Sequence, residues 1–223
     1  MIAKAFQAVT YWPIYSALKF FARYKIEGQE NLKGLENGGV IFASNHASFI
    51  DPQICGMAMP RESLTPQKFF PVRFLAAYEF FRWFKNPAFF PFSIIVAAYV
   101  RLNASIPVIR GLNNIEQNLA KAVEAVKNGD KIWIYPEGRV SKDGNIQKGK
   151  KGIVYLHQKT GAPIVPVGII GNFGILSFKT LLRKNSVKIK IGRPIRSLIA
   201  ETPEEAVSEV MRQIGDLVSS YSA

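Results

Sequence analysis

Short apolar runs alternate with amphipathic segments along most of the chain, and this alternation predicts strands separated by helices. Residues 40–43 form an uninterrupted apolar run, as expected of a buried strand. Residues 131–135 predict a second short strand, and residues 163–170 are so uniformly apolar that both faces of that strand should be covered. Residues 187–191 alternate apolar and basic side chains, which predicts an edge or half-exposed strand.

Three segments combine the apolar period of a helix with residues that begin or end helices. Asn113 or Asn114 can cap the first segment, and Asn128-Gly129 ends it. Thr202-Pro203-Glu204-Glu205 is a capping box with proline at the first helical position, and it opens the last segment. We expect these helices over residues 115–127, 149–159 and 203–221. Strands that alternate with helices predict an α/β fold, here a central mixed sheet flanked by helices.

Two stretches, residues 4–25 and 68–92, mix aromatic and basic side chains. The longest apolar run, Pro87 to Val100, has fourteen residues, fewer than the roughly 18 to 20 that a spanning helix needs. Aromatic residues flanked by cations in segments of this length are typical of elements that lie in the membrane interface. For the second stretch, an aromatic core element is the alternative. We expect residues 1–28 to be a membrane-associating helical segment and residues 29–223 to form a single domain.

Charge narrows the choice of partner. The formal net charge is +13, and residues 179–196 hold seven basic residues and no acidic one. Such a surface favours anionic lipid, a phosphorylated substrate or nucleic acid, unless it is a solvated face that only aids solubility. The aromatic runs are too apolar for an exposed nucleic-acid stacking platform, so we expect a membrane surface with anionic lipid and no nucleic acid. The single Cys55 excludes an internal disulfide and favours a reducing compartment.

Candidate chemistry is concentrated in the stretch from Asn45 to Asp51, which holds one of only two histidines. A neutral imidazole within reach of a carboxylate is the minimal apparatus of general-base catalysis, because the carboxylate stabilises the imidazolium that forms. Asp51 is predicted to be an N-cap, followed by Pro52 as the first helical residue. His46 then lies in a strand-to-helix loop that can fold Asp51 back toward the ring. The alternative is that Asp51 is a cap and nothing more.

A second group, Tyr135-Pro136-Glu137-Gly138-Arg139, follows another predicted strand, where loops of α/β folds tend to carry ligands. Gly138 lets a backbone N–H approach an anion, and Arg139 could add a bidentate donor. Glu137 would accept a substrate hydroxyl or hold an arginine. Arg110 ends a further apolar run. Taken alone, these features also fit a tight turn and surface charges. One cysteine and two separated histidines predict no metal site.

Together these blocks resemble the glycerolipid acyltransferase family, which includes 1-acylglycerol-3-phosphate acyltransferases. The matching order is Asn45-His46-x4-Asp51, Arg110, Tyr135-Pro136-Glu137-Gly138 and Ile164-Val165-Pro166-Val167, over residues 40 to 170. The resemblance implies that His46 is the general base and Asp51 its orienter. It implies that Arg110, Glu137 and Gly138 help hold the glycerol-phosphate part of the acceptor. The acyl donor would be a thioester of coenzyme A or of acyl carrier protein, with no metal or other cofactor.

The chain departs from the family pattern at several positions. Ala104 stands where a glycine is usual, and Pro107 interrupts that block. Tyr135 replaces a usual phenylalanine. Arg139-Val140-Ser141 stands where phosphatidic-acid-forming members often have Thr-Arg-Ser, and it is similar to members that use other lysophospholipids. These departures affect the expected phosphate site and the identity of the acceptor.

The expected activity is therefore direct transfer of a fatty acyl group to a lysophospholipid hydroxyl at the cytoplasmic face of a membrane. The expected acceptor is 1-acylglycerol-3-phosphate, and the alternative acceptor is lysophosphatidylethanolamine or another lysolipid. Neither Cys55 nor a serine is placed as an activated nucleophile, so no acyl-enzyme is expected. The competing class is a non-catalytic basic module that binds membrane or nucleic acid.

Overall fold

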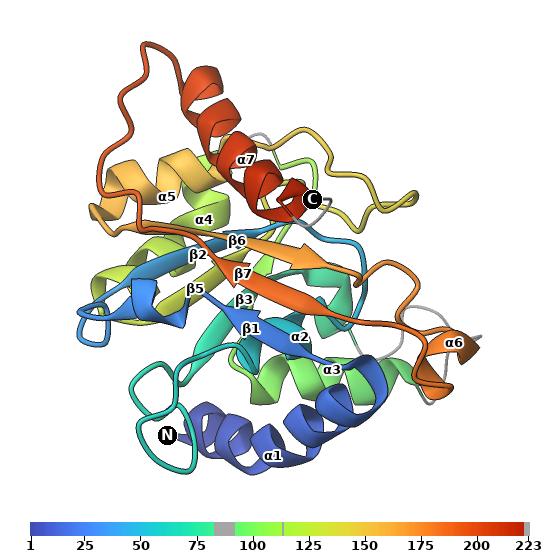
Figure 1. Ribbon diagram of the computed structural model, residues 1–223. Coiled ribbons are helices and arrows are strands. Elements are labelled where there is room, and N and C mark those ends of the chain that lie inside the picture. Colours follow the sequence, from blue (N-terminus) through green and yellow to red (C-terminus); the bar gives the residue numbers. More distant parts are fainter. Residues whose placement is uncertain (83–91, 113, 221–223) are drawn as a thin grey trace.

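The computed structural model describes residues 1–82, 92–112 and 114–220, and these residues build a seven-stranded mixed sheet with helices on both faces (Figure 1). The strand order is β1-β7-β6-β2-β5-β3-β4, and every neighbouring pair is parallel except β6 and β7. The strands are β1 (Lys25–Glu27), β2 (Val40–Ser44), β3 (Val72–Ala77), β4 (Ile106–Val108), β5 (Lys131–Ile134), β6 (Ile164–Ile170) and β7 (Lys188–Ile191). The predicted α/β fold with a central mixed sheet is confirmed.

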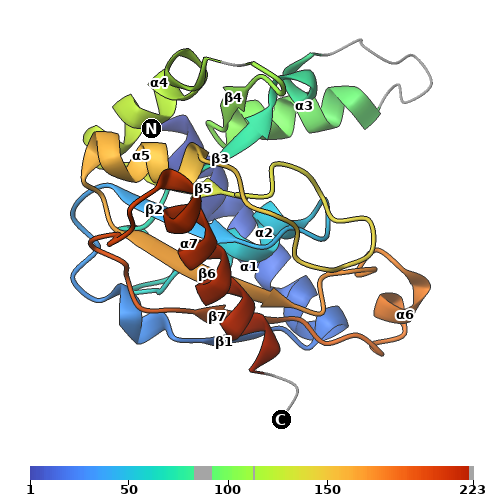
Figure 2. The same cartoon turned by 90° about the horizontal axis from the view of Figure 1, so that it is seen from above.

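Helices α4, α5 and α7 cover one face of the sheet, and α1, α2 and α3 lie on the other (Figure 1). Seen from above, α7 lies over β6 (Figure 2). The helices are α1 (Ile2–Ala22), α2 (Asp51–Gly56), α3 (Phe92–Leu102), α4 (Ile115–Lys127), α5 (Gly152–Thr160), α6 (Phe178–Leu181) and α7 (Pro203–Ser219), with 3-10 turns η1 (Gln29–Leu32) and η2 (Tyr78–Phe81).

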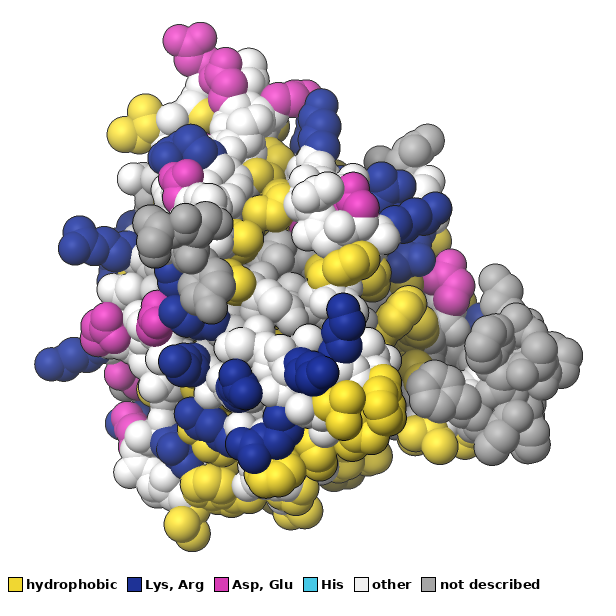
Figure 3. Space-filling view, turned by 45° about the vertical axis from the view of Figure 1, so that its right-hand side comes forward, with side chains coloured by type: hydrophobic (Ala, Val, Ile, Leu, Met, Phe, Trp, Pro, Cys, Tyr) yellow, Lys and Arg dark blue, Asp and Glu magenta, His cyan; other side chains and the backbone are white. Residues whose placement is uncertain are grey.

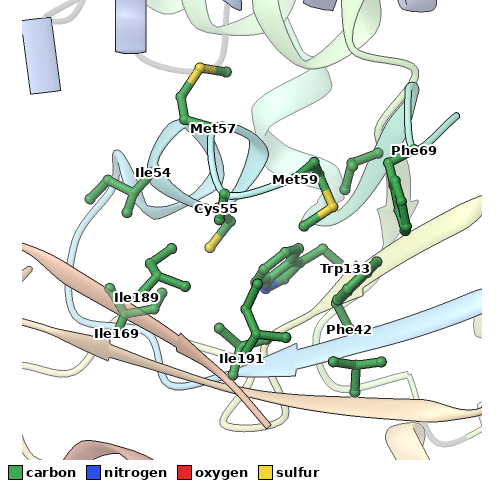
Figure 4. Close-up of a cluster of buried hydrophobic side chains, with 14 of the residues drawn as sticks. Phe42, Ile54, Cys55, Met57, Met59, Phe69, Trp133, Ile169, Ile189 and Ile191 are labelled. Atoms are coloured by element: carbon green, nitrogen blue, oxygen red, sulfur yellow. The ribbon is translucent and has the colours of Figure 1, made fainter. Parts of the chain in front are cut away.

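Strand β2 contributes to a hydrophobic core on each face of the sheet, because successive side chains of a strand point to opposite sides. Phe42 packs in the core beneath α1 and α2, whereas Ile41 packs in the core beneath α4, α5 and α7. On the α2 side, Phe42 stacks on Trp133 with ring centroids 5.0 Å apart, and Cys55 lies above them (Figure 4). Burial on both faces explains why this strand is apolar from Val40 to Ala43.

Most predicted elements form within a residue or two of the expected limits. Asn114 caps α4 through a bond from the Gln117 amide, and the capping box at Thr202 opens α7. The helix expected over residues 149–159 begins only at Gly152, and the chain just before it is bound to the loop after β5, where the Lys150 amide donates to the Pro136 carbonyl. The alternative cap Asn113 and the expected helix end at Tyr221 lie outside the described residues.

Strand β7 is half-exposed, as its alternating sequence predicts, but it is not at an edge. It lies between β6 and the short β1, which pairs with it in parallel through Ile26 and Ile189. The edge interpretation was wrong because the three residues of β1 are too few to give a periodic signal.

Helix α1 packs against the core of the domain through one face and leaves the other in solvent. Tyr11, Leu18 and Ala22 are buried, whereas Val9 and Phe20 are exposed. Strand β1, at the end of the same segment, belongs to the central sheet. No helix within the described residues has the length and apolar character required to cross a membrane. The division into residues 1–28 and 29–223 stays a prediction.

The second aromatic stretch is divided between the core and solvent. Phe69, Phe70 and Phe74 are buried in the core beneath α1 and α2, so the interface interpretation was wrong for them and the core alternative is correct. Their rings fill the space between β3 and the helices, which the local sequence cannot distinguish from lipid contact. Phe80 is exposed. Phe81 is half-buried. The side chains of Trp83, Phe84, Phe89, Phe90 and Phe92 lie outside what the structure describes.

Strands β2, β3, β4, β5 and β6 all run in the same direction, so their carboxyl ends meet at one edge of the sheet. In parallel sheets, ligands bind at this edge. The loops after β2, β4, β5 and β6 carry His46, Arg110, Glu137 and the segment that begins at Gly171. The topology thus brings every predicted site residue to the same edge.

Candidate functional site

His46 and Asp51 form a hydrogen-bonded pair directly after β2. The His46 Nδ1 atom lies 2.9 Å from Asp51 Oδ2, and the Asp51 side chain is fully buried. The carboxylate Oδ2 also accepts from the backbone amides of Ala47 and Ser48, each at 2.9 Å. With the Nδ1 proton donated to the carboxylate, the lone pair of the imidazole resides on Nε2. The predicted contact between His46 and Asp51 is therefore present in the structure, and their roles as base and orienter stay predictions.

Asp51 is the first residue of α2 and not its N-cap, which is Ile50. The expectation of an Asp51 cap was wrong by one residue, because the carboxylate turns back to the amides of the preceding loop instead of to those of the helix. Pro52 follows as the second helical residue. The backbone N–H groups of Ala47 and Ser48 thus hold the loop in the conformation that brings Asp51 to the imidazole ring.

Asn172 is a site residue that sequence reasoning missed. Its Nδ2 donates to Asp51 Oδ1 at 2.9 Å, and the side chain is buried. Asn172 stands two residues after the end of β6, so a polar residue just beyond a uniformly apolar strand was the available signal. This bond gives Asp51 a fourth donor and orients the carboxylate plane toward His46.

The His46 loop is held by the strands on both sides of β2. Asn45 donates to the Ile169 carbonyl and accepts from the Ile169 amide, at 2.9 and 2.8 Å. On the other side, the Ser141 amide donates to the His46 carbonyl at 2.7 Å. These bonds involve backbone groups of β6 and of the loop after β5, so they position His46 independently of its side chain.

Glu137 joins the His46 loop to the chain after β5. Its Oε1 accepts from the His46 amide and its Oε2 from the Gln147 amide, both at 3.0 Å. The residue is buried, and this burial raises the pKa of the Glu137 carboxyl, opposed by the two amide bonds. Both oxygens thus hold protein backbone, and contact of Glu137 with a substrate hydroxyl or an arginine stays a prediction.

Tyr135 stacks on the ring of His46. The ring centroids are 3.9 Å apart and the planes are inclined by 15°. This contact limits rotation of the imidazole. From sequence, Tyr135 was only a mild replacement for phenylalanine, and its position under His46 was not foreseen. His46 still keeps 16% of its side chain exposed, which leaves the imidazole accessible to a substrate.

Gly138 and the nearby cations occupy the outer part of the site. Gly138 has a φ of +71°, and its amide donates to the Tyr135 carbonyl, so this amide closes the turn. A Cβ at Gly138 would lie 2.9 Å from Lys150 Nζ, so the glycine makes room for a lysine that the sequence did not single out. Arg139 is exposed beside this turn.

Arg110 is exposed two residues beyond β4, at the same edge of the sheet as His46. Strand β4 is three strand spacings from β2, or about 14 Å at roughly 4.8 Å per strand. The structure thus places Arg110 on the same side as the base without bringing the two into contact. Its role in binding substrate stays a prediction.

A sequence model of the family described as Acyltransferase matches residues 23–170, which is more than half of the chain. This chain belongs to the acyltransferase family. The match includes the His46 loop, Arg110 and the turn at Glu137. Relatives are similar over most of the chain. This chain is 24% identical over 220 residues to the chloroplastic 1-acyl-sn-glycerol-3-phosphate acyltransferase BAT2 of Brassica napus. The similarity covers 96% of this chain and 56% of the relative.

A second relative is the chloroplastic 1-acyl-sn-glycerol-3-phosphate acyltransferase LPAT1 of Arabidopsis thaliana, 26% identical over 203 residues, covering 90% of this chain and 49% of that protein. This member of the acyltransferase family therefore spans about half the length of the curated relatives it matches. Its fold is that of the crystal structure of PlsC, the 1-acyl-sn-glycerophosphate acyltransferase of Thermotoga maritima. The TM-score is 0.69 at 23% identity, over 97% of this chain and 81% of that one.

Within the described residues of this acyltransferase-family chain, no three metal-ligating side chains lie close enough together to hold an ion. The chemically competent groups at the site are instead the His46–Asp51 pair and the surrounding cations. The arrangement can remove a proton from a hydroxyl that approaches Nε2 and can stabilise the resulting imidazolium.

Cys55 offers a test of whether a thiol takes part in this site. The residue is fully buried on the inner face of α2, and burial raises the pKa of its thiol well above the usual range. We expect native protein to resist alkylation by iodoacetamide, whereas urea-unfolded protein takes up one adduct, as measured by intact mass. Rapid alkylation of the native protein with loss of activity would place a reactive thiol at the site.

Proposed function

We propose that this protein transfers a fatty acyl group from an acyl thioester to the free hydroxyl of a lysophospholipid, in phospholipid biosynthesis. The observation that carries the proposal is the His46–Asp51 pair, in which a carboxylate with four donors leaves the imidazole Nε2 as a base. Family membership and the names of the relatives support acyl transfer over a non-catalytic basic module.

In the proposed reaction, His46 Nε2 takes the proton of the acceptor hydroxyl as its oxygen attacks the thioester carbonyl. A C–O bond forms, the C–S bond breaks, and the imidazolium returns the proton to the departing thiolate. Asp51 stabilises the imidazolium between these steps, and the stacked Tyr135 ring limits its rotation. No acyl-enzyme is required, and the buried Cys55 is not positioned as a nucleophile.

The acceptor is proposed to be 1-acylglycerol-3-phosphate, whose phosphate would face the exposed cations at the same edge of the sheet. Arg110, Arg139 and Lys150 supply that positive charge. The same charge suits either anionic donor, acyl-coenzyme A or an acylated acyl carrier protein. Arg139-Val140-Ser141 favours a second candidate acceptor, lysophosphatidylethanolamine. A panel of lysophosphatidic acid, lysophosphatidylethanolamine and glycerol-3-phosphate, read by mass spectrometry of the products, tests these assignments.

Replacement of Arg110 by alanine is expected to raise KM for a phosphorylated acceptor about tenfold with little change in kcat, because a charge contact far from the reacting atoms contributes to binding. Steady-state kinetics with lysophosphatidic acid measures both constants. Arg196→Ala is the matched control, since Arg196 is an exposed cation on the connection from β7 to α7, next to Gly161 at the opposite edge of the sheet. An unchanged KM in Arg110→Ala would move the phosphate site elsewhere.

The protein is proposed to act on the cytoplasmic face of a membrane that contains anionic lipid. The solvent-exposed side of α1 is apolar, with Ile2, Val9, Trp12 and Phe20 all exposed. Lys4 and Lys19 are exposed on the same helix. An apolar stripe with adjacent cations is the composition of a helix that lies at the membrane interface, where the acyl chains of both substrates are found.

A further inference from the structure

A second group of exposed apolar side chains lies outside α1, in the connection from β6 to β7. This connection includes the short helix α6, which the sequence pattern did not predict. The exposed fractions of its large apolar residues range from 51% to 71%. These residues are Phe173, Leu176, Phe178, Leu181 and Leu182. Contiguous exposed apolar groups mark interaction sites more often than isolated ones do.

This apolar group is joined to the end of α1. Arg183 Nε donates to the Phe20 carbonyl at 3.0 Å, and its guanidinium lies 4.5 Å from the centroid of the exposed Phe20 ring. Figure 1 shows α6 beside the carboxyl end of α1. In Figure 3, apolar side chains gather along the lower edge of the molecule with Lys and Arg side chains beside them. We call the residues Phe173 to Leu182 together with Phe20 and Phe21 the α1–α6 patch.

The charged side chains on the two chain segments of the α1–α6 patch are all positive. Lys19, Arg23, Lys179, Arg183 and Lys184 are exposed on or directly beside α1 and α6. The sequence has no acidic residue before Glu27 and none between Asp143 and Glu201. Apolar side chains that share their chain segments with cations and with no acidic residue complement an anionic bilayer surface. A second copy of this chain would instead bring like charges together, which disfavours a dimer through this patch.

The patch reaches the His46–Asp51 pair. Asn172, which binds Asp51, directly precedes Phe173. The Phe173 ring lies against the backbone of Gly144 in the loop after β5, where an added Cβ would be 2.9 Å from it. Within the His46 loop itself, Phe49 is 67% exposed. Exposed apolar side chains therefore stand both in the α1–α6 patch and in the loop that carries the base.

We propose that the segment Phe173–Leu182 docks an anionic bilayer together with the end of α1, and so sets the carboxyl edge of the sheet against the membrane. The proposal rests on the proposed function for its purpose, since the acceptor then reaches His46 from the lipid phase. Its physical basis is independent of catalysis, because it depends on exposed apolar side chains and surrounding charge. Binding to vesicles and acyl transfer can therefore be measured separately.

The test is the double variant Leu176→Asp/Phe178→Asp in the full chain, compared with Ile199→Asp. Ile199 is 98% exposed on the connection from β7 to α7, away from the α1–α6 patch, so it is a matched control. Flotation with vesicles of phosphatidylcholine and phosphatidylglycerol should show binding weakened about tenfold or more in the double variant and unchanged in the control. Lys179→Gln/Lys184→Gln should weaken binding to these vesicles and not to pure phosphatidylcholine vesicles.

Activity on a monomeric short-chain lysophosphatidic acid, without vesicles, should be unchanged in the double variant, which also verifies its fold. Wild-type vesicle binding by a double variant that retains this activity would overturn the docking proposal. Loss of a concentration-dependent dimer with unchanged vesicle binding would assign the patch to a second copy and would also overturn it. If the native protein binds vesicles through the patch but transfers no acyl group to any acceptor, the docking proposal stands and the proposed function fails.

Discussion

Replacing His46 with alanine is expected to abolish acyl transfer, with a loss of roughly a hundred- to ten-thousand-fold in kcat, the range that general-base catalysis contributes. Among the described side chains of this loop, only His46 has a ring nitrogen that can take up a proton. Its other ring nitrogen is hydrogen-bonded to the buried Asp51 carboxylate. The measurement is thiol release from acyl-coenzyme A or acylated carrier protein in the presence of lysophosphatidic acid. KM for either substrate should change little, because the imidazole acts on the transition state.

The fold should survive this change, since Asp51 keeps its three other donors and the His46 backbone keeps its bonds to Glu137 and Ser141. Thermal unfolding checks that point. His157→Asn is the matched control, because His157 lies in α5 and its Nδ1–H donates to the Ala162 carbonyl, just beyond the C-cap of that helix. Retained activity in the His46 variant would remove the base from the mechanism.

Asp51→Asn is expected to lower kcat by a similar factor while preserving the shape of the loop. The amide oxygen can replace Oδ2 as acceptor for His46, Ala47 and Ser48, and Asn172 can turn its own amide to meet the new NH₂ group. What is lost is the negative charge that stabilises the imidazolium. Steady-state kinetics should therefore show a fall in kcat without a matching rise in KM.

Asp51→Ala and Asn172→Ala make this prediction quantitative. Alanine at position 51 leaves the Ala47 and Ser48 amides and the Asn172 side chain without their acceptor, at about 1–3 kcal/mol of unfolding free energy for each buried group. Asn172→Ala removes a single donor and should have the smallest effect on kcat. Urea unfolding and kinetics together give the order of the three variants. A fully active Asp51→Asn would show that the carboxylate is only a structural acceptor.

Local sequence predicted the elements whose signals are themselves local. The apolar run of β2 and the capping box at Thr202 each depend on a few adjacent residues, and both form as expected. The His46–Asp51 pairing was predictable for the same reason, since five positions and a turn determine it. Short or irregular elements such as β1 and α6 carry too few residues for a periodic pattern.

The remaining parts of the site depend on contacts between distant segments. Asn172 meets Asp51 across 121 residues, and Glu137 meets the His46 amide across 91. Neither pairing leaves a trace in the local sequence, because each follows from the strand order. Glu137 was expected to accept a substrate hydroxyl or hold an arginine, and its bonds to two backbone amides could not be read from the local sequence. Tyr135 was likewise visible as a residue type, whereas its stacking on His46 required β5 to lie beside β2.

The bonds that hold the His46 loop have a consequence for folding kinetics. They connect β2 to chain segments 91 and 124 residues away, through Glu137 and Ile169. Contacts of such long range form late, since the entropy of closing a long loop must be offset by packing that already exists. A chain with its helices formed but β5 and β6 not yet docked would already show helical circular dichroism, while its imidazole would lack these constraints. Enzymatic activity in a refolding sample therefore counts only fully assembled molecules.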